Sequence, residues 1–120
     1  MYKFELPFPP SVNSYYRSLV KRGSSIAYVT RSAKGKAYRA AIKSLLHGTP
    51  TLTGNLFVNV VLHAPCNRRR DIDNYDGKAL FDSLTHAGVW QDDSQVKERH
   101  SKWGENVSGG KVVVEISVIE

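Results

Sequence analysis

The chain has 120 residues, of which 41% are hydrophobic, and these proportions predict one compact domain built around a single core. Its 17 lysines and arginines outnumber 11 aspartates and glutamates, and the formal net charge of +6 favours binding to polyanions such as nucleic acids. The single cysteine, Cys66, excludes an intrachain disulfide and a multi-cysteine zinc cluster.

A strand opens the chain, and a segment without a clear pattern follows it. Residues 2–6 alternate apolar and polar side chains, which predicts a strand with one buried face, and prolines at positions 7, 9 and 10 end it. Residues 11–31 are polar and aromatic with no clean period. We therefore expect mostly loop there, with one short strand over residues 26–29.

A basic amphipathic helix is predicted over residues 33–46. Its apolar and small residues recur at helical spacing, and the rest of the helical wheel carries four cations, Lys34, Lys36, Arg39 and Lys43. Thr30 or Ser32 supplies the start signal, and Gly48 ends the helix. Because residues 1–50 contain nine basic groups and one acid, we interpret the charged face as a phosphate-binding surface. The alternative is an ordinary solvated face.

The second half of the chain predicts three strands and one helix. Residues 55–63 are apolar on both faces, which is typical of a central strand, and residues 95–102 and 111–119 predict an exposed strand and a β-branched strand. The helix is predicted over residues 74–85, with Gly88 as its stop and an inward face of Ala79, Leu80, Ser83 and Leu84. The expected fold is α/β, or more closely α+β, with the order ββαβαββ. It is a single domain over residues 1–120 with a mixed sheet and two helices.

Two carboxylates follow directly after three cations in the run Arg68-Arg69-Arg70-Asp71-Ile72-Asp73. Extended backbone would aim both carboxylates to the same side, and such a pair suits Mg²⁺, which prefers a few carboxylate oxygens. Asp92 and Asp93 approach this pair if the second helix folds back on the strand before it. The three arginines and Lys78 would dock a DNA backbone that free carboxylates repel.

A purely structural interpretation of these acids is the competing hypothesis. Asp73 could cap the helix that follows it, Asp71 could pair with an arginine, and Asp92 could sit in a turn. Two aspartates one residue apart also occur often by chance.

Several blocks of the sequence together resemble the RusA family of Holliday junction resolvases. The blocks are RRDIDN at residues 69–74, KALFDSL at 78–84 and GVWQDDSQV at 88–96, and PPSVNSYY at 9–16 is similar to the N-terminal motif of that family. The resemblance spans nearly the whole chain and is weakest over residues 19–54 and 101–110. Ordered blocks with compatible spacing are far more specific than any one of them.

The resemblance implies which residues carry the chemistry. The catalytic, metal-holding aspartates of the family correspond to Asp71, Asp73 and Asp93, and its functional lysine corresponds to Lys78. Lys78 lies one residue later than in the family pattern, so either residues 76–77 absorb the extra residue or the side chain points about 100° away from the family position. The implied reaction is phosphodiester hydrolysis with Mg²⁺, for which Mn²⁺ can substitute.

The same reasoning gives candidates for DNA contact. Asn13, Tyr15, Tyr16 and Arg17 could meet bases opened at a branch point, although tyrosines that pack beneath a proline-set turn explain the pattern better. The predicted nucleic-acid-binding residues are Arg68, Arg69, Arg70, Asn13, Tyr16, Arg17, Lys34 and Lys36.

The expected substrate is branched DNA, above all a four-way junction, and the resemblance implies a homodimer. A two-fold dimer would present two equivalent sites for two symmetry-related nicks. Without a signal-peptide core or a run of roughly 20 apolar residues, we expect a cytoplasmic protein with no membrane association, and we expect no small-molecule cofactor. Two alternatives remain, a Mg²⁺ nuclease of broader branched or flap preference and a non-catalytic DNA-binding module.

Overall fold

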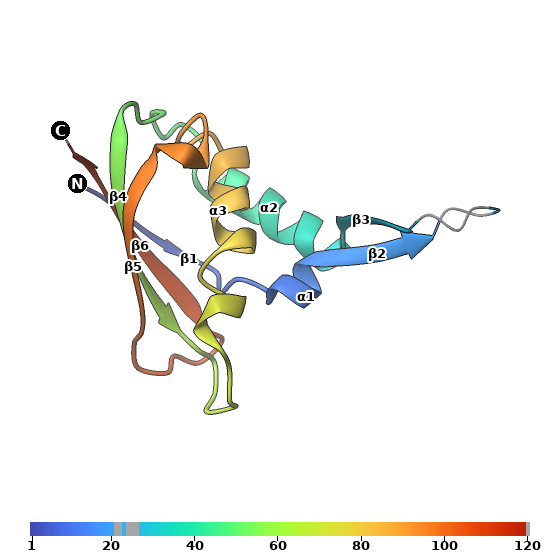
Figure 1. Cartoon of the computed structure of the whole chain (residues 1–120). Coiled ribbons are helices and arrows are strands. Elements are labelled where there is room, and N and C mark those ends of the chain that lie inside the picture. The colour runs from blue at the N-terminus through green and yellow to red at the C-terminus, as the bar shows by residue number, and fades with distance from the viewer. Residues whose placement is uncertain (21–22, 24–26, 120) are drawn as a thin grey trace.

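A four-stranded sheet carries helices on one face, and a two-stranded arm projects away from it (Figure 1). This computed structural model describes residues 1–20, 23 and 27–119. The elements in chain order are β1 (Tyr2–Leu6), α1 (Val12–Tyr15), β2 (Tyr16–Val20), β3 (Ala27–Arg31), α2 (Ala33–Leu45), β4 (Asn55–His63), the 3-10 helix η1 (Ile72–Asn74), α3 (Lys78–His86), the 3-10 helix η2 (Asp93–Gln95), β5 (Val96–Trp103) and β6 (Lys111–Ile119).

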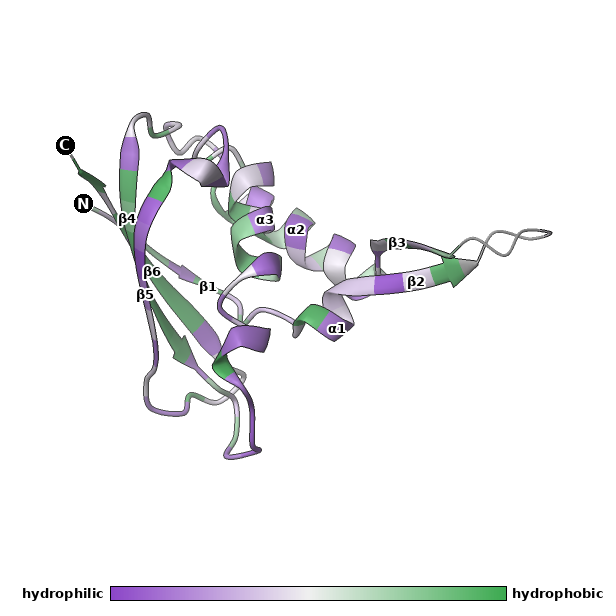
Figure 2. Ribbon diagram, viewed as in Figure 1, coloured by the Kyte–Doolittle hydropathy of each residue, from purple (hydrophilic) through white to green (hydrophobic). Residues whose placement is uncertain are grey.

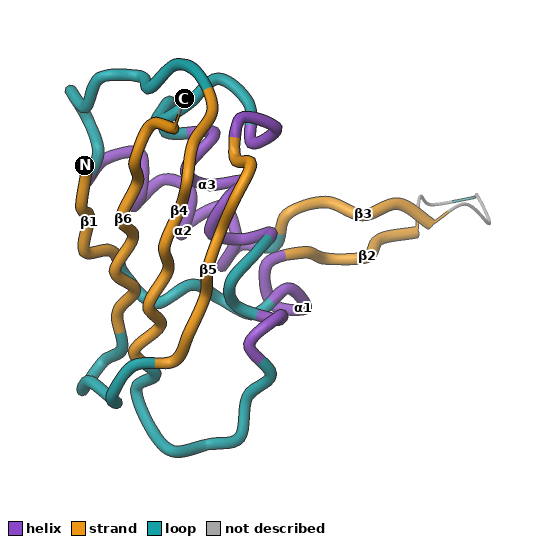
Figure 3. The backbone as a smooth tube through the Cα atoms, turned by 60° about the vertical axis from the view of Figure 1, so that its left-hand side comes forward, coloured by secondary structure: helices purple, strands orange, loops and turns teal. Residues whose placement is uncertain are grey.

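The sheet is mixed, as predicted, with the strand order β1-β6-β4-β5. β6 pairs antiparallel with both β1 and β4, whereas β4 and β5 are parallel. The predicted central position of β4 is confirmed, because Leu56, Val58, Val60 and Leu62 on its inner face are fully buried. A parallel pair needs a crossover connection, and the segment from η1 through α3 to η2 provides it (Figure 3).

Helices α2 and α3 cover one face of the sheet and close the core. The hydrophobic stretches of β4, β6 and α3 gather where these layers meet (Figure 2). Ala79, Leu80, Ser83 and Leu84 are all buried, which confirms the predicted inward face of α3. Trp90 seals the end of this core, with its ring centroid 5.6 Å from that of Phe81.

The described residues between 11 and 31 form a short helix and two paired strands, so the prediction of mostly loop was wrong. Tyr16 pairs with Arg31 at the base of the hairpin, and the strands run out from there. The predicted strand over residues 26–29 begins at Ile26, which lies outside the described residues, and its remainder is part of β3. Within the described part of the chain, no layer of helices or sheet lies beneath this hairpin, so neither of its faces has to be apolar. Its sequence therefore lacks the alternation of apolar and polar side chains that predicts a strand.

The base of the arm is joined to α2 by a close backbone contact. Ser32 caps α2 as predicted, and its hydroxyl accepts a hydrogen bond from the Gly35 amide at 3.0 Å and donates one to the carbonyl oxygen of Ser14. A Cβ atom at Gly35 would collide with the carbonyl oxygen of Tyr15. Glycine at this position therefore lets α2 pack directly on α1.

Helix α3 begins four residues later than predicted. Gly77 has φ −118° and ψ −103°, which is not helical, and residues 72–74 form a separate 3-10 turn. The described residues thus form three α-helices rather than two, in the order βαββαβαββ rather than ββαβαββ. The α+β class is confirmed. Within the described residues, no helix is long and apolar enough to cross a membrane.

Candidate active site

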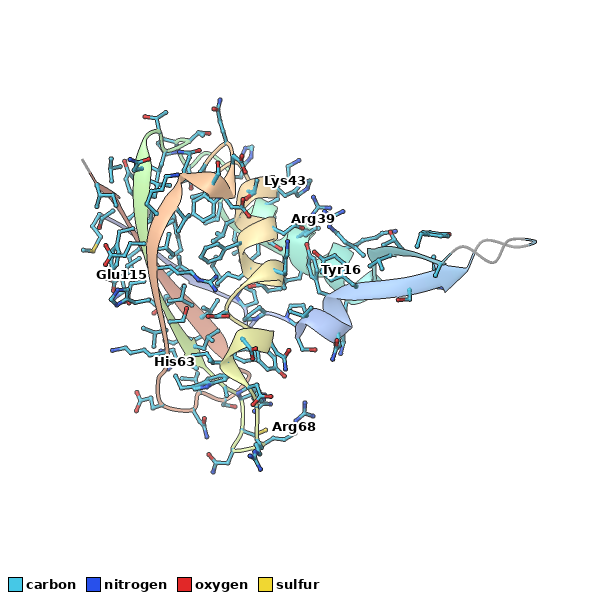
Figure 4. The ribbon with its side chains drawn as sticks, viewed as in Figure 1. Tyr16, Arg39, Lys43, His63, Arg68 and Glu115 are labelled. Atoms are coloured by element: carbon cyan, nitrogen blue, oxygen red, sulfur yellow. The ribbon has the colours of Figure 1, made fainter. Side chains whose placement is uncertain are left out.

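A small cavity lies between the first turn of α3, the η2 turn, strand β5 and the base of the arm. It has a volume of about 240 Å³ and is lined by Tyr16, Gly77, Lys78, Phe81, Asp82, Asp93 and Arg99. Lys78 and Asp93, two of the predicted catalytic residues, therefore meet in one cavity although 15 positions separate them in the sequence. Figure 4 shows Tyr16 where the arm meets this region.

The other two predicted ligands lie outside this cavity. Asp71 directly precedes η1 and Asp73 lies within it, and both are exposed. In the part of the chain that the structure describes, no three His, Cys, Asp or Glu side chains are close enough to hold one metal ion. Asp71 and Asp73 belong to the turn before α3, whereas Asp93 belongs to the η2 turn that follows it in the chain.

Two parts of the structural interpretation of the acids are contradicted. Asp73 does not cap α3, because the residue at the N-cap is Gly77. Asp71 takes part in none of the ion pairs found among the described residues. The charges of Asp71 and Asp73 therefore have no evident structural use.

The third part of that interpretation, Asp92 in a turn, is confirmed. The Asp92 carboxylate accepts hydrogen bonds from the hydroxyl and the amide of Ser94, at 2.9 and 3.4 Å, and these bonds hold its pKa below the ordinary value. Gln95 completes the capping box: its Oε1 accepts from the amides of Gln91 and Asp92 at 2.9 and 3.2 Å. The Asp92 carboxylate is thus occupied by hydrogen bonds within the turn, whereas Asp93 lines the cavity.

Arg99 on β5 is a cavity residue that sequence reasoning missed. Its Nη1 donates to the carbonyl oxygen of Asp76 at 3.4 Å, and its Nη2 lies 3.8 Å from the Asp76 carboxylate. The guanidinium also lies 5.2 Å from the centroid of the Phe81 ring. Arg99 therefore fixes the turn at residues 76–77, directly before Lys78. The available signal was a cation on the exposed strand predicted over residues 95–102.

Asp82 is the second residue that sequence reasoning missed, one helical turn after Lys78. Its carboxylate accepts hydrogen bonds from the Tyr15 hydroxyl and, at 3.1 Å, from Arg31 Nε, and it lies 3.4 Å from Arg39 Nε. Burial opposes ionisation of Asp82, but these bonds and the two guanidinium charges outweigh it and lower its pKa. Tyr15 is fully buried, so a contact of its ring with DNA is excluded and the packing alternative holds for this tyrosine, whereas Tyr16 is half-buried and lines the cavity.

The predicted DNA-binding residues are distributed over three surfaces. Asn13 and Arg17 are exposed at the base of the arm, and Lys34 and Lys36 are exposed on α2. Arg68 and Arg69 are exposed in the loop after β4, where Figure 4 shows Arg68 far from the arm. Arg70 differs from them, because its Nη1 donates to the carbonyl oxygens of Cys66 and Arg68 at 3.0 and 3.1 Å and so holds this loop together.

The fold and the site define a class of protein, a basic α+β domain with acidic residues and a lysine around one crossover helix. Comparison with known proteins gives the family. The family described as Endodeoxyribonuclease RusA matches residues 7–118, and the chain belongs to this family of nucleases. The resemblance in the sequence blocks is therefore confirmed, and so is the class of enzyme.

Individual relatives agree with this assignment. The chain is 37% identical over 122 residues to the crossover junction endodeoxyribonuclease rusA of Enterobacteria phage HK97, with 99% of this chain and 96% of the relative covered. It is 42% identical to the protein of the same name from Enterobacteria phage 82 and 41% identical to that from Escherichia coli K12. In both cases 98 residues align, which cover 79% of this chain and 76% of the relative. Crossover junctions are Holliday junctions, so the predicted resolvase activity is that of the family.

Proposed function

We propose that this chain resolves four-way DNA junctions in a Mg²⁺-dependent reaction, with Asp71, Asp73 and Asp93 as metal ligands and Lys78 as the assisting cation. The observation that carries the proposal is the cavity where Lys78 and Asp93 meet, at the helix that directly follows the loop of Arg68 and the first two aspartates. The names of the relatives support the substrate, because each is called a crossover junction endodeoxyribonuclease.

The chemistry of the three proposed ligands suits a hard divalent cation. All are exposed carboxylates, and none forms an ion pair with another described residue. Carboxylate oxygens are what Mg²⁺ prefers, and a site with few protein ligands leaves positions for water and phosphate. Among the described residues these carboxylates form no three-ligand cluster, so binding of one ion by all three requires them to come closer together.

The surrounding residues have distinct tasks in the proposed reaction. A bound Mg²⁺ ion would supply a water of lowered pKa and offset charge on the phosphate. Lys78 adds a second positive charge on the cavity wall opposite Asp93, where it stabilises negative charge that develops on the phosphate oxygens. Arg99 keeps Lys78 in place through Asp76 and is a positioning residue. Arg68 and Arg69 dock the DNA backbone.

The proposal includes a homodimer that makes two nicks related by symmetry, because a four-way junction has two equivalent strands to cut. It also includes a cytoplasmic location, which the phage and bacterial sources of the relatives support. A metal other than Mg²⁺, such as Mn²⁺, would substitute wherever it accepts the same oxygen ligands.

Cleavage of matched DNAs tests the activity. Four-way, flap and linear duplex substrates of the same sequence are incubated with Mg²⁺ and with a chelator. We expect the four-way junction to be cut in Mg²⁺ alone and the linear duplex to stay intact. Equal cutting of all three DNAs would contradict a resolvase, preferential cutting of the flap would favour the broader nuclease, and binding without any cutting would indicate a DNA-binding module.

The neighbouring acids Asp92 and Asp93 provide a matched pair for testing the ligands. We expect Asp93→Asn to lower cleavage by more than about 100-fold and to abolish the rise in melting temperature that Mg²⁺ causes. Asp92→Asn should retain both, because its amide oxygen still accepts from the Ser94 amide and its NH2 group can donate to the Ser94 hydroxyl. Asp71→Asn should behave as Asp93→Asn does and still bind DNA, since no basic contact is lost. Full cleavage by either of these two variants would refute the ligand assignment.

A further inference from the structure

A second, larger cavity lies against the loop after β4. It has a volume of about 490 Å³, is open to solvent and is bordered by the segment before α1, residues of α1, the first turns of α2 and residues 65–75. None of the four proposed catalytic residues lines it. Its volume falls within the range of cavities that bind small organic groups.

The floor of this cavity is aromatic and fixed in position. Phe8, Tyr38 and Tyr75 line it, and the rings of Phe8 and Tyr75 are 5.2 Å apart. The Tyr38 hydroxyl donates to the carbonyl oxygen of Pro7 at 2.9 Å, and only 7% of Tyr38 and 9% of Tyr75 are exposed. Phe8, which is only half-buried, is therefore the ring that a flat heterocycle can reach, and the two buried tyrosines hold it in position.

The rim of the cavity is cationic. Lys34, Arg68 and Arg70 line it, and no acid does. Lys34 and Arg68 are exposed, and neither takes part in an ion pair within the described parts of the chain, so both charges can meet an anion. Arg70 instead lies 5.9 Å from the Phe8 ring centroid and holds the loop backbone.

Two hydroxyl groups add hydrogen-bonding capacity between floor and rim. Ser11 and Ser14 both line the cavity, and the Ser11 hydroxyl donates to that of Ser14 at 3.1 Å. A hydroxyl can both donate and accept a hydrogen bond. This pair can therefore bind the donors or the acceptors on the edge of a nucleobase. The cavity thus combines the three features that an unpaired nucleotide requires, a stacking surface, polar contacts for the base edge and cations for the phosphate.

We propose that this cavity binds one unpaired nucleotide of the DNA substrate, with the base on the aromatic floor and its phosphate at Lys34 and Arg68. This inference rests on the proposed function, because a branch point is where a base leaves the stack at the lowest cost. The wall formed by Arg68 and Arg70 leads directly into Asp71. A nucleotide in the cavity would therefore fix the segment that has to approach Asp93, and cutting would depend on the presence of a branch.

Binding measured with a chelator, so that no DNA is cut, tests the cavity separately from the activity. The probes are a duplex with a single unpaired thymidine, the same duplex with an abasic site at that position, and a fully paired duplex. We expect removal of the base to weaken binding about tenfold, the usual effect of one lost stacking contact. Equal affinity for the unpaired and abasic probes would overturn the proposal.

Matched variants show whether the discrimination resides in this cavity. Ala37→Leu fills the cavity from α2 and should abolish the difference between the unpaired and abasic probes, whereas Ala40→Leu, on the same helix outside the cavity, should retain it. Leucine is a good helix former, so both variants should fold, and thermal unfolding confirms this. Arg68→Gln should weaken binding of the unpaired probe more than Arg69→Gln does, because Arg69 does not line the cavity.

The comparison of the unpaired and abasic probes does not depend on cleavage. Unchanged discrimination in Ala37→Leu would place the bound base elsewhere and overturn the inference. Cutting of four-way junctions by the unmodified chain in Mg²⁺ is a separate measurement, so failure of one proposal is distinguishable from failure of the other.

Discussion

Gln95 uses both ends of its side chain to hold the turn that carries Asp93. Besides accepting from two amides of the turn, its Nε2 donates to the carbonyl oxygens of Leu52 and Gly54 at 3.1 and 3.0 Å, directly before β4. The position of Asp93 relative to the sheet therefore depends on one amide side chain. The exposed neighbour Gln91 takes part in this network only through its backbone.

We predict that Gln95→Ala lowers the free energy of unfolding by about 1–2 kcal/mol, because four backbone groups lose a hydrogen-bond partner and the bond to Leu52 is partly buried. Cleavage should fall further than DNA binding, since Asp93 loses its support while the basic surfaces are unchanged. Gln91→Ala is the matched control and should have little effect on either. Denaturant unfolding and parallel cutting and binding measurements check this, and equal stability of the two variants would argue against the role of Gln95.

At the residue level the sequence predicts the charge and chemistry of a side chain better than it predicts which other side chains it contacts. The preference for Asp93 over Asp92 comes from sequence blocks, and the turn geometry is consistent with it. Asp82 and Arg99 could not be found in this way, because each acquires its role from a residue far away in the chain. Asp82 in isolation looks like an ordinary polar residue on a helix.

At the level of elements, one carboxylate joins the arm to the crossover helix. Asp82 on α3 contacts Tyr15 from α1 and Arg31 from the end of β3, so it links the hairpin to the body of the molecule. The hairpin has few other supports, because Tyr28 and Val29 on it are largely exposed. A two-stranded ribbon is marginal by itself in water, so this link matters for its orientation.

The lowered pKa of Asp82 predicts a dependence of stability on pH. The folded state favours the ionised carboxylate, so its contribution is present above the unfolded pKa of about 3.9 and is lost as the pH falls through the lower folded value. Asp82→Asn should therefore be less stable than the unmodified chain at pH 7, with the difference shrinking below about pH 4. Glu5→Gln, which breaks the exposed pair with Lys111, should change stability little. Unfolding curves across pH measure both, and a constant difference for Asp82→Asn would contradict the linkage.

Elements with a buried face were predictable and those without one were not. β1, β4 and β6 were predicted within a residue of their observed bounds, because each places apolar side chains against the core. The arm was missed because nothing packs beneath it. The start of α3 was misplaced because its boundary depends on the backbone of Gly77 and on Arg99, not on apolar spacing. The separation of η1 from η2 likewise follows from the helix between them.

For the whole molecule, the segregation of charge along the sequence predicts how binding responds to salt. The first 50 residues hold nine of the cations, and α2 presents its share on an exposed face. Each phosphate contact releases a counterion, so the logarithm of the affinity should fall linearly with the logarithm of the salt concentration. The slope counts the contacts that the basic surfaces make.

We predict that Lys36→Gln on α2 reduces that slope by about one and weakens binding of all DNAs alike. Lys3→Gln removes the same charge from the exposed strand β1 and should leave the slope unchanged. Titrations of duplex DNA at several salt concentrations give both slopes. An unchanged slope in Lys36→Gln would indicate that the charged face of α2 is an ordinary solvated face that does not contact phosphate.

Strand β5 borders the sheet, and this has a consequence for how copies of the chain meet. An open border with free amide and carbonyl groups invites further strands, and in many proteins such growth ends in fibres. Here that border carries a run of charged and polar side chains, Lys97, Glu98, Arg99 and His100, all exposed. Ribbon-like growth of the sheet through β5 is thereby discouraged.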